Sequence, residues 1–203
     1  MMKIFRINHN TEIMQNPKSD FILSTIISNT KPYSTIESFS DKPGIYGITL
    51  LPTSKPLKCG ELVIASGTLL YIGMTKLSQS ERDVKCHFAS GRTRKSTLRR
   101  TLGAILLNEL NLKLRPSSIT VNYKFDNEGE EKLTEWMKAN LGLGYYEYDG
   151  EVSDIAELER GVIKLASPPL NIKHNEKSPC YSELLESRNR CKILAGECHR
   201  IYK

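Results

Sequence analysis

Two short runs constrain the fold of this chain most strongly, because each carries a tyrosine and a glycine among apolar, β-branched residues. They are Gly44-Ile45-Tyr46 and Tyr71-Ile72-Gly73. Proline and glycine residues punctuate the chain around them, and alternation of side chains predicts two β-strands. In adjacent strands, both phenols can face the same side of a sheet. The glycines leave room for a second backbone or a ligand to come close. Taken alone, the runs fit a plain hairpin with two half-buried tyrosines equally well.

Composition favours a soluble globular protein with one main core. The chain has 203 residues, of which 39% are hydrophobic and 26% charged, and this length suits one sizeable domain with appended segments. No apolar run approaches the ~18 residues of a membrane span, and the first residues lack the apolar segment of a secretory signal. We therefore expect a cytoplasmic protein that does not associate with membranes. The five cysteines are scattered, without a CxxC pair or zinc-ligand spacing, so reduced thiols are expected.

The charge of the chain is positive and unevenly distributed. The formal net charge is +6 and the isoelectric point is near 9.0, which favours a polyanionic partner. Between residues 84 and 115 there are eight basic residues and a single acid, Glu109. Part of this block falls in the first turn of a predicted helix, where positive charge is unfavourable unless an anion lies nearby. A bound phosphate satisfies that condition, and a solvated basic face is the alternative.

The remaining sequence predicts a main domain over residues 43–175, an N-terminal extension over 1–42 and a C-terminal helical tail over 176–203. Apolar spacing and capping residues predict helices over 78–88, 96–110, 128–141, 154–167 and 180–203. Alternation predicts further strands over 61–65, 118–125 and 145–148. Gly142 and Gly144 are expected to end the third of these helices, and Asp154 with Glu157 forms a capping box at the start of the fourth. The fold class is therefore α+β, with a small, mostly antiparallel central sheet flanked by helices.

The order of these motifs resembles the GIY-YIG nuclease superfamily. The two tyrosine runs match the triplets that name the superfamily, and Arg82, His87 and Glu159 match an arginine, a histidine and a glutamate that follow. The segment from Glu159 to Asn171 resembles the E-x-x-L-I-x-x-x-x-P-x-x-N ending of the family. The stretches 87–91 and 96–104 look like a bacterial branch of the superfamily. The resemblance covers about residues 43 to 175, and its strength lies in five elements in the same order.

The resemblance implies hydrolysis of DNA phosphodiester bonds with the help of Mg²⁺ or Mn²⁺. Such hydrolysis needs an activated water, neutralisation of charge at phosphorus and a stabilised leaving 3′ oxygen. Glu159 is the expected metal ligand, because Mg²⁺ retains waters and accepts phosphate oxygens beside few protein ligands. The implied role of Tyr46 is to position or deprotonate the water, and that of Tyr71 is to bind or shape the phosphate site. A phenol with a pKa near 10 is a poor base unless nearby cations lower that value.

The other implied site residues bind phosphate or support the catalytic groups. Arg82 is expected to contact the scissile phosphate, and His87 to act as a base or a hydrogen-bond partner. Asn171 is expected in the site, orienting Glu159 or the backbone more plausibly than taking part in the chemistry. Without the resemblance, Glu159 fits a solvated helix carboxylate and Asn171 an ordinary turn residue. The candidates for further phosphate contacts are Lys76, Arg92, Lys95, Arg99 and Arg100.

Two features depart from the family pattern. The segment between the triplets is longer than the compact hairpin of the family, so residues 52–67 form an insertion that alters access or adds a contact surface. Arg82 and His87 are five residues apart, whereas residues four apart share a helix face. Either Arg82 lies at the first turn of a helix that begins late, or Lys85 takes the role of the arginine.

The predicted function is a metal-dependent DNA endonuclease, with a homodimer as a possible way to cut both strands. A nucleic-acid-binding module that keeps the scaffold without cleaving is the first alternative. A basic protein-interaction domain with purely structural tyrosines is the second. Cleavage, and then the salt dependence of DNA binding, distinguish the three.

Overall fold

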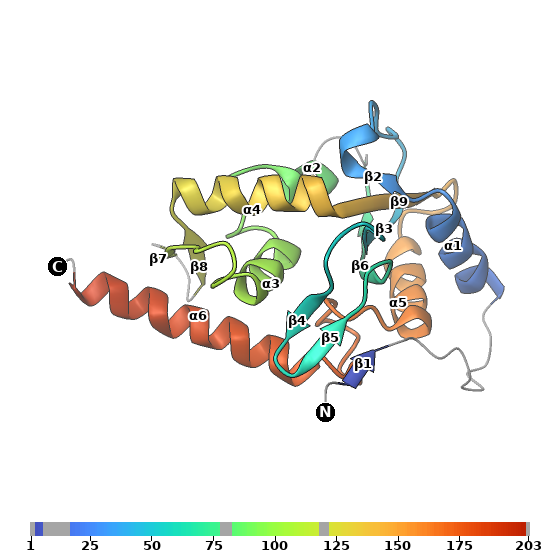
Figure 1. The fold of residues 1–203 in the computed structure, drawn as a ribbon. Helices are drawn as coiled ribbons and strands as arrows, with labels where there is room; N and C mark the ends of the chain where they lie inside the picture. The colour runs from blue at the N-terminus through green and yellow to red at the C-terminus, as the bar shows by residue number, and fades with distance from the viewer. Residues whose placement is uncertain (1–2, 6–16, 78–82, 118–121, 202–203) are drawn as a thin grey trace.

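A four-stranded antiparallel sheet forms the centre of the computed structural model, which describes residues 3–5, 17–77, 83–117 and 122–201. The strand order is β2-β9-β3-β6, and the strands span Lys31–Pro32, Leu141–Glu147, Gly44–Leu50 and Leu69–Thr75. The two predicted tyrosine strands are β3 and β6, and they are adjacent. Helices lie on both sides of the sheet (Figure 1). The predicted α+β class is thus confirmed.

The register of β3 and β6 places the two tyrosines on one face. Tyr46 pairs with Gly73, and Ile48 pairs with Tyr71. Directly paired residues of an antiparallel ladder point to the same side of the sheet. The phenols of Tyr46 and Tyr71 therefore share a face, with a ring centroid separation of 6.5 Å.

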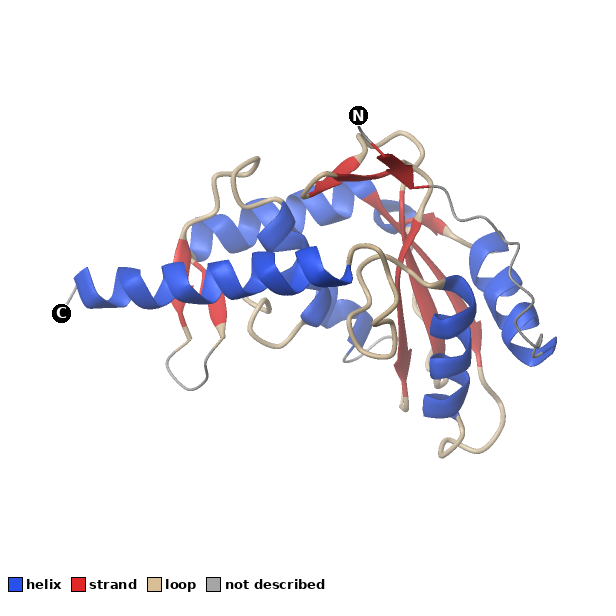
Figure 2. Cartoon of the chain, turned by 90° about the horizontal axis from the view of Figure 1, so that it is seen from below, coloured by secondary structure: helices blue, strands red, loops and turns tan. Residues whose placement is uncertain are grey.

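Two hydrophobic clusters cover the two faces of the sheet. The tyrosine face packs under α2 (Asp83–Phe88), α3 (Thr97–Ile105) and α4 (Asn127–Asn140), which contribute Phe88, Leu98, Leu102, Leu133 and Met137. The opposite face packs under α1 (Pro17–Ser28) and α5 (Ile155–Ala166). Figure 2 shows α1 and α5 beside each other on that side. Each strand of the sheet centre is consequently buried from both sides, as its apolar composition requires.

The segments outside the predicted main domain contribute to these clusters. Ile22 and Ile26 of α1 are fully buried against the face opposite the tyrosines. The last helix, α6 (Tyr181–Ile201), packs on α3 and on β7 (Leu114–Pro116), and its Leu184 and Cys191 belong to the same cluster as Tyr46. The described parts of both terminal segments therefore share the core with residues 43–175, and the N-terminal segment was expected to pack partly on that core.

Two small sheets complete the fold. In one, β4 (Leu57–Cys59) and β5 (Leu62–Ile64) form a hairpin inside the 52–67 insertion, and β1 (Lys3–Phe5) pairs in parallel with β5. In the other, β7 pairs with β8 (Tyr123–Phe125). A 3₁₀ helix over Tyr33–Thr35 follows β2. Part of the predicted 118–125 strand lies outside the described residues.

Capping residues fix the starts of α3 and α4, and the capping box predicted for α5 is absent. The hydroxyl of Ser96 accepts from the Arg99 N–H at the start of α3, and the Asp126 carboxylate accepts from the Gly129 N–H at the start of α4. Asp154 precedes α5 without any side-chain capping bond, because its backbone is already in the right-handed helical region. The predicted capping box of Asp154 is therefore wrong.

The glycines expected to end α4 lie inside a strand instead. The helix stops at Asn140, and Gly142 and Gly144 belong to β9. A side chain at Gly144 would overlap the carbonyl oxygen of Ile26 in α1. Gly144 therefore serves the close packing of α1 on β9, and Gly142 lies tightly against Thr30, Lys31 and Leu51. Among the helices in the described residues, none combines the length and the apolar character that crossing a bilayer requires.

Candidate active site

A chain of hydrogen bonds starts at the first tyrosine and ends at the cap of α3. Tyr46 Oη lies 2.7 Å from His87 Nε2, and His87 Nδ1 lies 2.6 Å from Ser96 Oγ. The Ser96 hydroxyl also accepts from the backbone N–H of Arg99 at 3.1 Å. A neutral imidazole donates from only one nitrogen. With the proton on Nδ1, His87 donates to Ser96 and Nε2 accepts from the phenol of Tyr46.

His87 stays neutral over the physiological range. Its side chain is buried, and burial lowers its pKa to about 4, with a further contribution from the positive charge of Arg99. The Arg99 guanidinium also donates to the backbone carbonyl of His87 at 3.1 Å. A neutral ring is the form that can accept a proton from Tyr46. The structure thus places His87 beside Tyr46 as a hydrogen-bond partner, which is one of its two predicted roles.

Tyr71 completes an aromatic group around His87. Its ring lies 5.7 Å from the His87 ring in an edge-on arrangement, and the Tyr46 ring lies 5.8 Å from the same imidazole. Tyr46 is 3% exposed, whereas Tyr71 is half-buried. Tyr71 is therefore the member of the group that meets the surface.

Gly73 provides the space in which the Tyr46 phenol lies. A Cβ atom on Gly73 would overlap Tyr46 Oη and Cζ. The sequence predicted that this glycine leaves room for a backbone or a ligand. The room is taken by the first tyrosine itself, because Gly73 and Tyr46 are paired in the register of β3 and β6.

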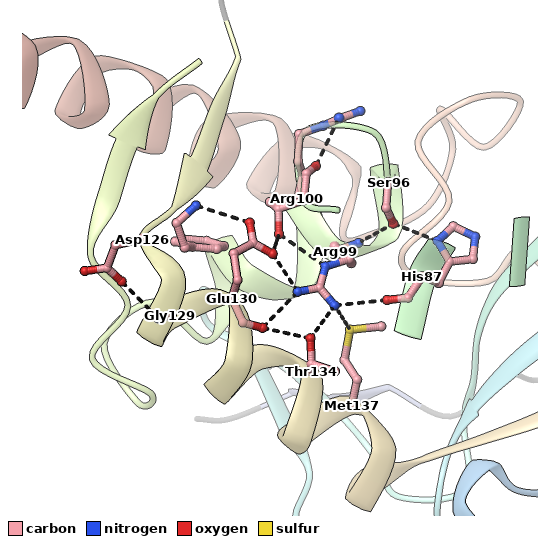
Figure 3. A network of polar contacts seen from close by, with 11 residues as sticks. His87, Ser96, Arg99, Arg100, Asp126, Gly129, Glu130, Thr134 and Met137 are labelled. Atoms are coloured by element: carbon pink, nitrogen blue, oxygen red, sulfur yellow. Dashed lines mark hydrogen bonds and ion pairs between the residues drawn. The ribbon is translucent and has the colours of Figure 1, made fainter. Parts of the chain in front are cut away.

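Arg99 is buried and paired, which corrects its prediction as a phosphate contact. Its side chain is fully buried, and Nη2 lies 2.7 Å from Glu130 Oε2 of α4. The same guanidinium donates to Thr93 Oγ1, Thr134 Oγ1 and two backbone carbonyls. Figure 3 shows this network, which joins α2, α3 and α4 next to His87. Its donors are used inside the protein, so Arg99 positions the site and does not face nucleic acid.

Asn171 binds the backbone of β6, the edge strand that carries Tyr71. Its Oδ1 accepts from the N–H of Ile72, and its Nδ2 donates to the carbonyl of Ile72, both at 2.8 Å. The backbone N–H of Leu170 donates to the carbonyl of Leu70 at 2.9 Å. The segment before α6 thus covers the free edge of β6 and satisfies its polar groups. Asn171 is consequently a positioning residue, in line with the orienting role that the sequence favoured for it.

Glu159 lies on the sheet-facing side of α5, which packs against β6. It is half-buried, and its helix neighbours Ile155, Val162 and Ile163 at i−4, i+3 and i+4 are buried. Within the described residues there is no group of three or more His, Cys, Asp or Glu side chains that could hold a metal ion. A single carboxylate still fits the donor set of Mg²⁺, which completes its coordination with water and phosphate oxygens.

The residues predicted to contact phosphate differ in how exposed their side chains are. Lys76, which directly follows β6, and Arg92 and Lys95 of the loop between α2 and α3 are exposed. Arg100 is half-buried and donates to the carbonyl oxygens of Thr93 and Arg94. The predicted arginine, Arg82, lies outside the described residues, as does the side chain of its substitute Lys85.

Two contributors to this region were missed at the level of sequence. Ser96 or Thr97 was expected only to start the predicted helix over 96–110, but Ser96 also fixes the imidazole of His87. Glu130 belongs to the predicted helix over 128–141, and nothing in the sequence assigned it a partner, but it is 4% exposed and pairs with Arg99. No local signal identifies Glu130, because its partner is 31 residues away. The position of Ser96, nine residues after His87, gave no such signal either.

Comparison with known proteins agrees with the motif order. The sequence profile of a family described as the GIY-YIG catalytic domain matches residues 44–191, which is more than half of the chain. Searches of curated proteins and of solved structures returned no significant match. The profile match includes the tyrosine strands, His87, Glu159, Asn171 and the first half of α6. The chain therefore belongs to the GIY-YIG catalytic-domain family, and its function is of the nuclease type.

Proposed function

We propose that this protein is a divalent-metal-dependent endonuclease that hydrolyses phosphodiester bonds of DNA. The observation that carries this proposal is the convergence of Tyr46, Tyr71 and His87 on one face of the sheet. The hydrogen-bonded pair of Tyr46 and His87 is suited to moving a proton, and a plain structural hairpin has no need of it. The exposed residues Lys76, Arg92 and Lys95 supply positive charge for the DNA backbone.

Tyr46 and His87 activate the attacking water as a relay. The water oxygen forms the new bond to phosphorus while its proton passes to Tyr46 Oη. The bond from phosphorus to the 3′ oxygen breaks in the same step, and the leaving oxygen takes a proton from solvent water. The phenol proton passes in turn to His87 Nε2, which lies 2.7 Å away. This relay avoids a free phenolate, which is unfavourable because the reference pKa of a phenol is near 10. In the protein without DNA, burial and Arg99 disfavour a charged His87, and the negative charge of an approaching phosphate favours it.

Tyr71 and the basic side chains position the phosphate against this pair. Tyr71 is the half-buried member of the aromatic group, and its phenol is the proposed contact of a phosphate oxygen. Contacts from lysine and arginine to neighbouring phosphates fix the register of the DNA without reading its sequence. Arg82 is proposed to contact the scissile phosphate, as the family pattern implies.

Glu159 is the proposed ligand of the divalent ion, Mg²⁺ or Mn²⁺. A bound ion of this kind supplies positive charge at the phosphate and stabilises the leaving oxygen. The protein contributes the Glu159 carboxylate from the sheet-facing side of α5, and the packing of this helix holds the carboxylate in place. Asn171 holds the β6 backbone between Tyr71 and Gly73 in place through its two bonds to Ile72.

Nicking of supercoiled plasmid tests this function. We expect the wild type to convert supercoiled plasmid to open circles with Mg²⁺ or Mn²⁺ and not with EDTA. We expect Glu159→Gln to lose this activity while it still binds DNA. Glu157→Gln is the matched control, because Glu157 is exposed on the same helix, and it should nick like the wild type. DNA binding by the wild type without nicking under any of these conditions would support a binding module instead.

A further inference from the structure

Tyr145 of β9 extends the row of tyrosines across the central sheet. It is the direct partner of Tyr46 in the ladder of β3 and β9, so the two side chains point to the same face. Tyr71 lies on that face as well, on the strand at the other side of β3. Tyr145 is half-buried, and the ordered motifs give it no role. Three adjacent strands therefore each carry one tyrosine on the face of the candidate site.

A side-chain amide holds the backbone of Tyr145 in place. Asn29 Oδ1 accepts from the Tyr145 N–H at 2.9 Å, and Asn29 Nδ2 donates to the Tyr145 carbonyl at 2.5 Å. Asn171 makes the same two bonds to Ile72, the neighbour of Tyr71 on β6. The backbones of both outer tyrosine strands are thus fixed in the same way. The Tyr145 side chain starts from a rigid position, as a binding residue requires.

Tyr145 lines a hollow between β9 and the segment over residues 29–38. The hollow has a volume of about 420 Å³, which lies in the range of ligand pockets. Leu143, which is buried, and Ile36, which is half-buried, supply apolar surface. Other lining side chains are polar, among them Lys31 and Glu37. The hollow therefore combines one aromatic ring with polar and charged groups.

Lys31 brings a positive charge to the same face of the sheet. It pairs with Leu143 across β2 and β9, and Leu143 pairs with Ile48 of β3. Ile48 is in turn the partner of Tyr71, so Lys31 and Tyr71 lie in one row across the sheet. At the usual strand spacing, β2 is about 10 Å from β3. Lys31 is exposed, and among the described residues no carboxylate lies within ion-pair distance of its ammonium group.

Two acidic side chains lie near Tyr145, and one of them is compensated. Glu147 follows Tyr145 by two residues on the same face of β9, and its carboxylate lies 3.6 Å from the ammonium group of Lys42. Glu37 lines the hollow and is exposed. Its charge opposes an anionic ligand, whereas the charge of Lys31 attracts one. Removal of the two charges is therefore expected to change the binding of an anion in opposite directions.

We propose that Lys31 and Tyr145 form a subsite for a DNA backbone phosphate that flanks the scissile one. This inference rests on the proposed function and adds the segment before β3 to the surface that contacts DNA. Lys31 supplies the charge, and the Tyr145 phenol donates a hydrogen bond to a phosphate oxygen. The cleaved strand then crosses the sheet from β6 toward β2, with Tyr46 between Tyr71 and Tyr145.

DNA binding as a function of salt tests the charge of the subsite without any requirement for cleavage. Affinity for a short fluorescein-labelled duplex is measured in EDTA over a series of NaCl concentrations. We expect Lys31→Gln to weaken binding by about fivefold and to reduce the slope of log affinity against log salt by about one. Lys58→Gln is the matched control, because Lys58 is exposed on β4 of the separate three-stranded sheet. It removes the same charge and should keep a slope near that of the wild type.

Tyr145→Phe and Glu37→Gln separate this role from a purely structural one. Tyr145→Phe keeps the ring and its packing, so its Tm should equal that of the wild type. It should weaken DNA binding by about fivefold through the lost hydrogen bond, with an unchanged salt slope because a phenol carries no charge. Glu37→Gln should strengthen binding by about two- to threefold. An unchanged salt slope for Lys31→Gln, or wild-type affinity of Tyr145→Phe, would overturn the subsite.

The outcomes for the subsite and for the nuclease are distinguishable. Plasmid nicking by the wild type, together with a normal salt slope in Lys31→Gln, would remove the subsite and leave the nuclease. A reduced slope in Lys31→Gln and weaker binding by Tyr145→Phe, in a protein that never nicks, would keep the phosphate contact and remove the catalytic proposal.

Discussion

The absence of a side chain at Gly73 determines where the Tyr46 phenol lies in the candidate site. The Tyr46 phenol lies where a side chain of residue 73 would be, and its oxygen reaches His87 from there. The register between β3 and β6 fixes this arrangement, so neither residue can change without disturbing the other. Adding a single methyl group at Gly73 is therefore expected to displace the Tyr46 phenol.

We predict that Gly73→Ala displaces the Tyr46 ring and lowers nicking activity by at least about tenfold, since small misplacements of catalytic groups have large effects on rate. Overpacking of this kind also destabilises the fold by about 1–3 kcal/mol. Gly196→Ala is the matched control. Gly196 lies in α6 with nothing near its added Cβ, so alanine there should stabilise the protein by about 0.5–1 kcal/mol. Wild-type nicking by Gly73→Ala would contradict the account.

His87 makes a pH-dependent contribution to stability. In the unfolded chain it takes up a proton near pH 6.5, whereas in the native state it does so only near pH 4. The unfolded state therefore binds more protons between these values, and native stability falls as the pH drops through this window. The full effect is about 3 kcal/mol, since each pKa unit corresponds to about 1.4 kcal/mol.

Urea unfolding of the wild type and of His87→Gln at pH 7 and pH 4.5 measures this contribution. We expect the wild type to lose more stability than the variant over this interval, because the variant lacks the titrating group. Equal losses in the two proteins would show that His87 is not held neutral in the native state.

At the scale of elements, the buried ion pair of Arg99 and Glu130 connects three helices. Arg99 belongs to α3, Glu130 to α4, and the carbonyl of His87 in α2 accepts from the same guanidinium. Glu130 also accepts from Thr93 Oγ1 at 2.8 Å. This network holds the helix layer that carries His87 and Ser96 over the tyrosine face of the sheet.

Removing one member of this pair leaves the other charge buried and uncompensated. We predict that Glu130→Gln and Arg99→Met each destabilise the protein by about 3–5 kcal/mol. The double variant Arg99→Met/Glu130→Met should lose clearly less than the sum of the two single changes, as a denaturation-based double-mutant cycle would show. Additive losses would mean that the two side chains do not interact.

At the scale of the whole molecule, the sequence predicted the strands and helices that are specified by patterns of neighbouring residues. The tyrosine strands alternate over seven residues each, and Ser96 and Asp126 are caps that act within one turn. These signals were sufficient for the α+β class, whereas the family followed from the resemblance of the ordered motifs. The order of the motifs also predicted His87 as a site residue, and in the structure its Nε2 lies 2.7 Å from Tyr46 Oη.

The features that the sequence did not predict depend on contacts between distant segments. Arg99 looks like a surface cation until Glu130 is placed beside it by the packing of α3 on α4. Gly142 and Gly144 resemble helix terminators, but both lie in β9, where Gly144 allows the approach of α1 and Gly142 lies against Thr30 and Lys31. Long-range packing thus decides which charges are buried and which face a ligand.

The rate of DNA cleavage by Tyr46→Phe tests the central claim most directly. This change removes only the oxygen that lies 2.7 Å from His87 Nε2. Under single-turnover conditions with Mg²⁺, we predict a rate at least about 100-fold below the wild type, with unchanged DNA affinity in EDTA. Tyr148→Phe, at a buried tyrosine of the opposite cluster, should cleave normally. Cleavage by Tyr46→Phe at the wild-type rate would contradict the account.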